Sequence, residues 1–264
     1  MGPLSGVRVV VTRPRAQAGR LVAALERHGA EVLLFPAIRI VGPADPARLR
    51  RAVSGLGRYD WVVFNSTNGV DLFFEALSEA GRDASALSGV RVACVGPVTA
   101  RALERRGVRA DVVPDRYVAE EVVSALVASH GPALAGARVL LPVAAAARPV
   151  LADGLAAAGA DVDQVEAYRA VADTAGLAGL RRRLEAGEVD VITVASGLTA
   201  EYLVDAIGPD LGRAVVAVIG PVTAAAARRL GLPVAIEAKE YTAEGLVAAV
   251  VEHFAAERRG SGRV

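Results

Sequence analysis

Four short polar turns in this chain contain residue types that bind anions. Gly-Pro-Val-Thr occurs at residues 96–99 and again at 220–223, each time directly after an apolar run. Asn-Ser-Thr-Asn-Gly at 65–69 and Ala-Ser-Gly-Leu-Thr at 195–199 also follow apolar runs. Glycine lets a ligand approach the backbone, and proline at the first helical position leaves the next N–H groups exposed. We therefore expect four anion-binding turns at helix N-termini.

The hydroxyl groups of these turns have a second interpretation, because serine and threonine also cap helices that bind no ligand. Four such turns in related positions favour a ligand with several negative groups. A nucleotide site is not expected, because GxxxxGK[ST] is absent and no GxGxxG follows a strand. The candidate binding residues are Ser66, Thr67, Asn68, Gly69, Gly96, Thr99, Ser196, Gly197, Thr199, Gly220 and Thr223.

Arg13 and Tyr168 stand out against this neutral polar background. Arg13 follows an apolar run, where its guanidinium suits a carboxylate, although a surface ion pair explains it equally well. Tyr168 can donate a proton or a hydrogen bond in a cleft, or pack against a core with its hydroxyl in water. The sequence shows no Ser/His/Asp arrangement and no close pair of carboxylates. It therefore predicts a binding cleft rather than a conventional acid–base or nucleophile site.

The chain contains an internal duplication. Residues 93–127 align without a gap with residues 217–251, at an offset of 124 positions. Residues 6–14 align with residues 136–144 at an offset of 130. Two copies of one unit generally face each other across a cleft, so we expect the function to lie between them.

Apolar β-branched runs alternate with Ala/Leu/Arg-rich helical patterns in both copies. Near-continuous apolar strands are typical of a parallel sheet with both faces covered, and five strands per unit indicate a doubly wound, flavodoxin-like α/β fold. Sequence order leaves open whether each copy makes its own sheet or the copies exchange strands. Val32–Val41 and Val162–Val171 are longer strand-like stretches at equivalent places. Helices are expected at 17–28, 70–80, 99–106, 119–129, 148–158, 177–186, 200–207, 223–230 and 243–257.

Composition excludes several classes of protein. The 264 residues are 53% hydrophobic and carry a net charge of +1 without a basic stripe, which argues against nucleic-acid binding. No run is long enough to cross a membrane and no secretory signal is present, so we expect a cytoplasmic protein. The single cysteine, Cys94, is expected to be a core residue, and the three histidines lack metal-ligand spacing.

The chain carries an ordered set of motifs at residues 11–14, 59–70, 95–100, 168, 196–197, 219–224 and 241–246. Together they resemble the uroporphyrinogen-III synthase family over residues 6–254. The resemblance implies an α/β protein of two flavodoxin-like doubly wound parallel-sheet lobes, joined by a two-stranded β-ladder, with the two copies interleaved. It implies a first lobe of residues 1–37 and 170–264, a second of 38–169, and a ladder near 33–41 and 163–171.

The resemblance also implies an enzyme, a hydro-lyase that closes linear hydroxymethylbilane into uroporphyrinogen III with the terminal ring inverted and water lost. Such enzymes need no cofactor or metal, and the main catalytic contribution is to orient the substrate through its carboxylates. Tyr168 matches the family tyrosine that is proposed to assist departure of the hydroxyl. Where the family often has an arginine, this chain has Val143, and we expect Arg148 to supply the charge one helical turn later.

The expected partner is this small substrate, with neither nucleic acid nor membrane. We expect a monomer that can make transient contact with the preceding enzyme of the pathway. The alternative function is a non-catalytic regulatory homologue that senses a tetrapyrrole or another anion. Because the chain retains Arg13 and Tyr168, the enzyme is favoured.

Overall fold

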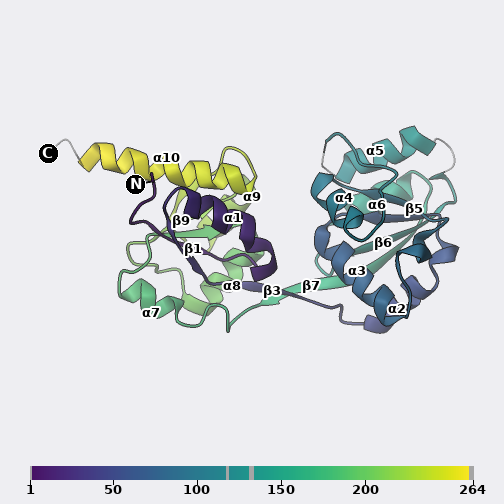
Figure 1. Ribbon diagram of the computed structural model, residues 1–264, viewed down its shortest axis with the longest axis horizontal. Coiled ribbons are helices and arrows are strands. Elements are labelled where there is room, and N and C mark those ends of the chain that lie inside the picture. Colours follow the sequence, from purple (N-terminus) through teal and green to yellow (C-terminus); the bar gives the residue numbers. More distant parts are fainter. Residues whose placement is uncertain (1, 117–118, 131–133, 262–264) are drawn as a thin grey trace. The chain divides into compact units, whose positions relative to one another are not determined.

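The computed structural model contains two α/β lobes, each built around a five-stranded sheet (Figure 1). The first lobe comprises residues 1–39 and 171–264, and the second comprises residues 40–170. Two lobes of parallel sheet confirm the fold class predicted from the sequence. The structure describes residues 2–116, 119–130 and 134–261.

The sheet of the first lobe has the strand order β2-β1-β8-β9-β10, and every pairing in it is parallel. Numbered along the chain within this lobe, the order is 2-1-3-4-5, which is the flavodoxin-like doubly wound order. Its strands are β1 (Arg8–Val11), β2 (Glu31–Leu34), β8 (Val191–Val194), β9 (Val215–Val218) and β10 (Val234–Glu237).

The sheet of the second lobe has the order β3-β7-β6-β4-β5, with parallel pairs from β7 to β5. The run Ala110–Pro114 would be the fifth strand that the repeat predicts for the first copy, but it makes only a single parallel bridge, between Ala93 and Val112. In the repeat, this run is equivalent to β10 of the first lobe, which lies 124 positions further along the chain. The strands are β3 (Ile38–Val41), β4 (Trp61–Phe64), β5 (Arg91–Cys94), β6 (Arg138–Ala144) and β7 (Asp161–Ala172).

The two copies of the repeat exchange strands. The first lobe takes β1 and β2 from the first copy and β8, β9 and β10 from the second. The second lobe takes β4 and β5 from the first copy and β6 and β7 from the second. Sequence order left two topologies open, and the structure has the one in which the copies exchange strands. The pairing of β1 with β8 and of β4 with β6 shows this.

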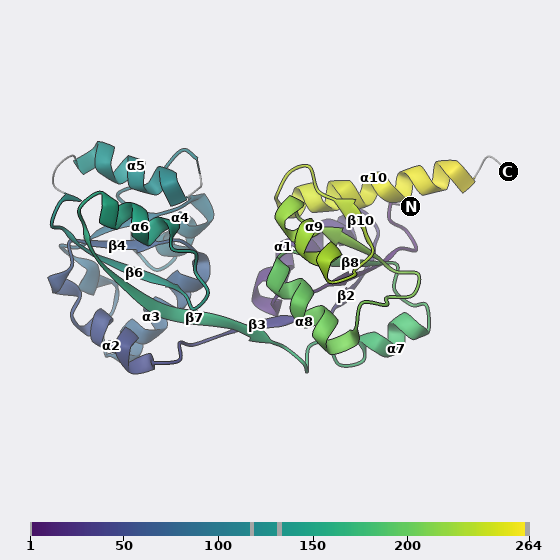
Figure 2. The same cartoon turned by 180° about the vertical axis from the view of Figure 1, so that it is seen from behind.

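The helices of the first lobe cover both faces of its sheet. Alternate strand residues such as Val10 and Ile192 pack with α7, α8 and α9, whereas Val9 and Val191 pack with α1 and α10. Helices α1 and α10 lie side by side in Figure 1, and Figure 2 shows α8 and α9 on the near side of the sheet. The bounds are α1 (Arg15–Arg27), α7 (Leu180–Glu185), α8 (Gly197–Ile207), α9 (Pro221–Arg229) and α10 (Ala243–Ser261).

The second lobe has the same layered arrangement, with α2, α3 and α4 on one face of its sheet and α5 and α6 on the other. Helix α2 was not predicted, although Asp45 caps its N-terminus and Pro46 occupies its first position, a recognisable start signal. The bounds are α2 (Pro46–Ser54), α3 (Thr67–Glu79), α4 (Pro97–Glu104), α5 (Ala119–His130) and α6 (Val150–Ala157), with short 3₁₀ turns at Leu56–Arg58 and Ala84–Leu87.

The chain passes from one lobe to the other within two neighbouring strands, β3 and β7. Strand β7 is continuous over twelve residues. The other strand-like stretch, Val32–Val41, is divided into β2 and β3 by three residues around Pro36. A proline has no N–H to donate to a strand ladder, which explains the interruption.

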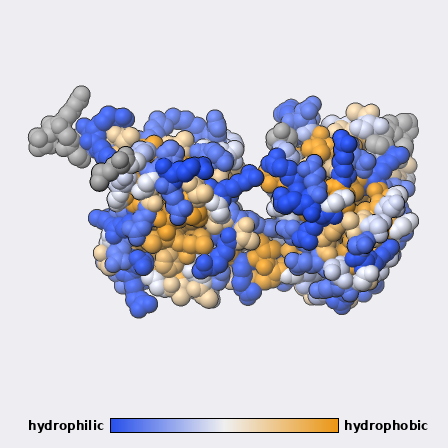
Figure 3. Space-filling model, in the orientation of Figure 1, coloured by the Kyte–Doolittle hydropathy of each residue, from blue (hydrophilic) through white to orange (hydrophobic). Residues whose placement is uncertain are grey.

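Hydrophilic side chains cover much of the surface that Figure 3 shows on each lobe, with smaller hydrophobic areas between them. Among the described residues, no helix has both the length and the apolar character that a membrane span requires. Helices α1, α4, α6 and α9 are each followed closely by a glycine with positive φ, the left-handed conformation typical of a residue that ends a helix: Gly29, Gly107, Gly159 and Gly231.

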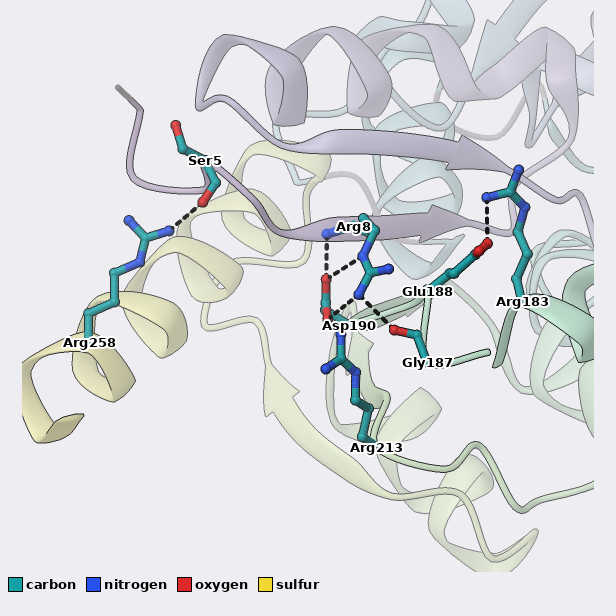
Figure 4. Close-up of polar contacts among 8 residues, drawn as sticks. All are labelled: Ser5, Arg8, Arg183, Gly187, Glu188, Asp190, Arg213 and Arg258. Atoms are coloured by element: carbon teal, nitrogen blue, oxygen red, sulfur yellow. Dashed lines mark hydrogen bonds and ion pairs between the residues drawn. The ribbon is translucent and has the colours of Figure 1, made fainter. Parts of the chain in front are cut away.

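A carboxylate joins strands of different copies at the amino edge of each sheet. In the first lobe, Asp190 Oδ2 accepts hydrogen bonds from the backbone N–H of Arg8 at 2.8 Å and from its Nε at 3.2 Å (Figure 4). Its Oδ1 accepts from Arg213 Nη2 at 2.7 Å. In the second lobe, Asp60 accepts from the backbone N–H of Arg138 at 2.8 Å. We call this bond between an aspartate of one copy and a strand of the other the charged clamp, and it occurs in both lobes.

Burial alone would raise the pKa of Asp190, but the hydrogen bonds and charge of Arg8, together with the charge of Arg213, outweigh it and hold the pKa below its usual value. A carboxyl group with a depressed folded-state pKa stabilises the fold fully at pH values above its unfolded pKa, about 3.9. This contribution is lost as the pH falls through the folded-state pKa.

We predict that Asp190→Ala lowers the free energy of unfolding by about 2 kcal/mol at pH 7, because it removes hydrogen bonds to a charged acceptor. The difference from the unsubstituted protein should shrink as the pH falls below about 4, where the unfolded chain takes up the proton. Urea unfolding at both pH values measures it. Glu75→Ala, at an exposed position on α3, serves as the control. An Asp190→Ala effect that stays constant with pH would contradict the charged clamp.

Candidate functional site

The anion-binding turns predicted in the first lobe lie along one edge of its sheet. Because the strands are parallel, the segments after β1, β8, β9 and β10 all leave from the carboxyl edge, where ligands bind in open α/β sheets. The strand order places Arg13, the turn at 195–199, the turn at 220–223 and the loop before α10 in succession. The fold thus brings the first-lobe candidates to one edge.

Ser196 caps helix α8. Its Oγ accepts a hydrogen bond from the Thr199 backbone N–H at 3.2 Å and lies 2.8 Å from the Thr199 hydroxyl. Thr199 is only 3% exposed, and a Cβ on Gly197 would come within 3.2 Å of the Ala226 methyl carbon. This turn is therefore a closely packed cap whose hydroxyls already bond to one another.

Helix α9 begins differently, with Gly220 at the N-cap and Pro221 at the first position. No side chain caps it, and its first turn has no acidic residue. Thr223 is 6% exposed, and its hydroxyl bonds to no residue that the structure describes. The N–H groups of this turn thus keep their capacity to bind an anion.

Arg13 follows β1 and is half-buried. Burial lowers its pKa, and the nearby charge of Glu244 partly opposes that shift. Arg13 forms no ion pair or hydrogen bond within the described part of the chain. The surface ion pair considered from the sequence is therefore not formed there, and the guanidinium group remains available for a carboxylate ligand.

In the second lobe the structure joins two candidates that are distant in sequence. Ser66 Oγ lies 2.9 Å from the Tyr168 hydroxyl, and it also caps α3 by accepting from the Gly69 N–H at 3.1 Å. A Cβ on Gly69 would come within 3.1 Å of the Pro142 carbonyl oxygen and 4.0 Å of Tyr168 Cε1. Ser66, Gly69 and Tyr168 therefore form one packed cluster beside the carboxyl ends of β4 and β6.

Of the two settings that the sequence left open for Tyr168, the structure shows a ring packed in a core, but with its hydroxyl bonded within the protein. It is 8% exposed and packs in the same hydrophobic core as Val70 and Phe64, with its hydroxyl held by Ser66. Thr67 and Asn68, which begin α3, are half-buried beside this cluster. A buried ring with a fixed hydroxyl has little rotational freedom, as a positioned proton donor requires.

The turn at the start of α4 repeats the design of α9. Gly96 occupies the N-cap, Pro97 follows, and no side chain caps the helix. Thr99 is 6% exposed, like Thr223 in the first lobe. The duplication thus preserves an uncapped helix N-terminus in each lobe.

Arg148 does not have the predicted setting. Helix α6 begins at Val150 rather than Arg148, so Arg148 lies in the exposed segment between β6 and α6. Val143, at the position where the resemblance implies an arginine, is 3% exposed within β6. Pro149, at the N-cap, explains the later start, because a proline disfavours helical geometry in the residue before it.

Asn65 begins the predicted turn at 65–69 but was not among the candidate binding residues. Its Oδ1 is buried and has no hydrogen-bond partner among the described residues, directly before the Ser66 cap. The signal was its position at the end of β4, in the first of the four turns.

Cys94 is confirmed as a core residue, since it is fully buried and burial raises its pKa to about 11. The described residues also contain no group of three His, Cys, Asp or Glu placed to hold a metal ion.

A family model described as Uroporphyrinogen-III synthase HemD matches residues 19–248. The chain belongs to this family. The resemblance seen in the sequence is thereby confirmed, and the family comprises lyases of tetrapyrrole biosynthesis.

Relatives with this name align over most of the chain. The uroporphyrinogen-III synthase of Synechococcus elongatus is 29% identical and the alignment covers 94% of this chain and 96% of that protein. The chloroplastic enzyme of Oryza sativa subsp. japonica is 31% identical, over 85% and 73% of the two chains. The porphyrin biosynthesis protein HemD of Ruminiclostridium josui is 28% identical, and this chain spans only 49% of its length.

Solved structures of the family share the fold. A mutant uroporphyrinogen III synthase of Thermus thermophilus aligns with a TM-score of 0.61 at 23% identity, over 95% of this chain and 99% of that one. The enzyme of Helicobacter pylori 26695 aligns with a TM-score of 0.62 at 16% identity, over 94% and 99%. At this level of identity, the likeness supports the two-lobe fold.

We predict that Ser66→Ala lowers the free energy of unfolding by about 1 kcal/mol, because it removes the N-cap of α3. Thermal or urea unfolding followed by circular dichroism measures this change. Ser78→Ala, at an exposed position of the same helix, is the matched control and should be neutral or slightly stabilising. Equal losses in the two variants would show that the cap bond at Ser66 contributes nothing specific.

Proposed function

We propose that this chain is a uroporphyrinogen-III synthase that converts hydroxymethylbilane into uroporphyrinogen III and water. The observation that carries the proposal is the character of the helix N-termini that follow β4, β5, β8 and β9. None of these four helices has an acidic residue in its first turn. Within a family of this name, such turns suit a substrate with eight carboxylates.

The proposed reaction needs little chemistry from the protein. Electrons of the pyrrole nitrogen expel the terminal hydroxyl group, which leaves as water once it is protonated. The substituted carbon of the fourth ring attacks the resulting azafulvenium carbon and forms a spiro intermediate. This intermediate fragments and recloses with the ring inverted, and loss of a ring proton completes uroporphyrinogen III. The protein's task is to favour this closure over the one that gives the type I isomer.

Tyr168 is the proposed proton donor to the departing hydroxyl. Its hydroxyl lies 2.9 Å from Ser66 Oγ, so the serine orients the phenol group. Ser66 also caps α3, which fixes the serine in turn. General acid assistance of this kind contributes about 10²–10⁴ in rate.

The substrate carboxylates are proposed to bind at the turns through many modest hydrogen bonds, together with Arg13. Gly96, Gly220 and their following N–H groups supply donors without charge. Each neutral hydrogen bond contributes about 0.5–1.5 kcal/mol, so affinity depends on their number. The remaining proposed contributors at these turns are Thr67, Asn68, Thr99, Ser196, Gly197, Thr199 and Thr223. Arg148 remains a proposed contributor from the segment between β6 and α6.

The purified protein should convert hydroxymethylbilane to the type III isomer without added cofactor. Chromatography of the oxidised products separates type III from type I, which forms without enzyme. Treatment with a chelator should leave the yield of type III unchanged. If only the type I isomer formed, the synthase assignment would be overturned, and a sensing homologue that binds the product would replace it.

Tyr168→Phe should lower kcat about 100-fold and change KM by about threefold or less, because the hydroxyl acts as the leaving group departs while the ring keeps its packing. Steady-state kinetics beside a melting curve measures both effects. Tyr59→Phe is the matched control. Tyr59 is 3% exposed in the same lobe, and the substitution likewise removes a hydroxyl hydrogen bond, the one to Asp163. Unchanged kcat in folded Tyr168→Phe would reduce Tyr168 to a packing residue.

A further inference from the structure

Two apolar side chains are strongly exposed beside the carboxyl edge of the first lobe. Val222, at the second position of α9, is 85% exposed, and Tyr241, in the loop between β10 and α10, is 66% exposed. No other described tyrosine, phenylalanine or tryptophan is among the exposed large hydrophobic side chains. Burial in a core therefore does not account for these two side chains.

The Tyr241 ring lies directly over Gly220. A Cβ at Gly220 would come within 2.8 Å of Tyr241 Cδ1 and 3.2 Å of Cε1. Gly220 has a φ of 170°, an extended conformation open to any residue. A side chain at Gly220 would therefore occupy the space that the Tyr241 ring fills. The ring packs directly on the backbone at the start of α9.

The backbone around Tyr241 is held in place despite its exposure. A Cβ at Gly245 would come within 2.2 Å of the Glu240 carbonyl oxygen, so the loop approaches α10 as closely as glycine permits. Thr242 accepts the Gly245 N–H on its Oγ1 at 2.9 Å, and its own N–H bonds to the Glu240 oxygen at 2.8 Å. An aromatic ring fixed in this way loses little freedom when a ligand stacks on it.

The ring adjoins unused hydrogen-bonding capacity. The first turn of α9 has no side-chain cap, and the nearly buried Thr223 hydroxyl has no partner in the described parts of the chain. An acidic residue, Glu244, occupies the first turn of α10, whereas α9 has none in its first turn. A ligand with a flat apolar face and carboxylates would therefore direct its carboxylates toward α9.

We propose that Tyr241 and Val222 form a platform on which one pyrrole ring of the substrate stacks, with the acidic side chains of that ring bound at the N-terminus of α9. The proposal rests on the proposed synthase function and adds two specificity-determining residues to the site. Stacking fixes the plane of a ring, whereas hydrogen bonds to flexible acid side chains do not. A platform therefore supplies the orientation that favours type III closure.

The repeat contains the same pair of residue types in its other copy. Gly96 and Tyr117 stand 21 positions apart, as do Gly220 and Tyr241. Tyr117 lies outside the described residues. In the sequence, then, a tyrosine accompanies each Gly-Pro-Val-Thr turn.

The binding test uses porphobilinogen, a single pyrrole that carries one acetate and one propionate, so it needs no turnover. In the full-length protein, titration followed by NMR should shift the signals of Tyr241 and Val222. Tyr241→Ala should weaken porphobilinogen binding about tenfold, whereas Tyr241→Phe, which keeps the ring, should stay within about twofold. Val127→Ala, an exposed valine on α5 of the other lobe, is the control and should not change binding.

Kinetics separates the platform from the proposed function. Tyr241→Ala should raise KM for hydroxymethylbilane about tenfold and increase the share of type I product, with a melting temperature within about 3 °C of the original. If Tyr241→Ala proves unstable, Tyr241→Leu keeps the bulk without the aromatic face and should show the same loss. Type III synthesis with binding and KM unchanged in both variants would overturn the platform while the synthase function stands. Tyrosine-dependent binding without any type III product would support the platform and overturn the synthase.

Discussion

The parallel pairing of β1 with β8 is the contact on which the rest of this molecule depends. It joins Val9–Val11 to Val191–Thr193, residues about 180 positions apart, and thereby places a strand of the first copy inside a sheet of the second. The pairing of β4 with β6 does the same in the other lobe. Once these pairs form, the order of both sheets and the two crossings in β3 and β7 follow.

This interleaving decides which turns share an edge. Arg13 comes from one copy, and the turns at 195–199 and 220–223 come from the other, yet all leave the same edge of the first sheet. In the second lobe the same exchange brings Ser66 of the first copy to Tyr168 of the second. The site in each lobe is therefore assembled from both halves of the sequence, and neither copy contains it alone.

The polar groups at these edges are mostly neutral. The uncapped helices α4 and α9 present neutral backbone N–H groups there, and the half-buried Arg13 adds a cation at the edge of the first sheet. Neutral donors are less costly to bury than charges, because an unpaired buried cation loses its hydration. Such an edge can receive several carboxylates without being destabilised when it is empty.

The internal repeat, the flavodoxin-like class and the four turns could be predicted from the residues alone, because they depend on residue order, local propensity and turn chemistry. The sequence also indicated helix α9 and its proline start. The pattern of strands and helices left open whether the copies exchange strands, because both topologies satisfy the same alternation. The family resemblance implied the exchange, and the pairing of β1 with β8 and of β4 with β6 shows it. The bond between Ser66 and Tyr168, the exposed setting of Arg148 and the position of Tyr241 over Gly220 needed the structure, because they are contacts between segments whose separation in sequence carries no local signal.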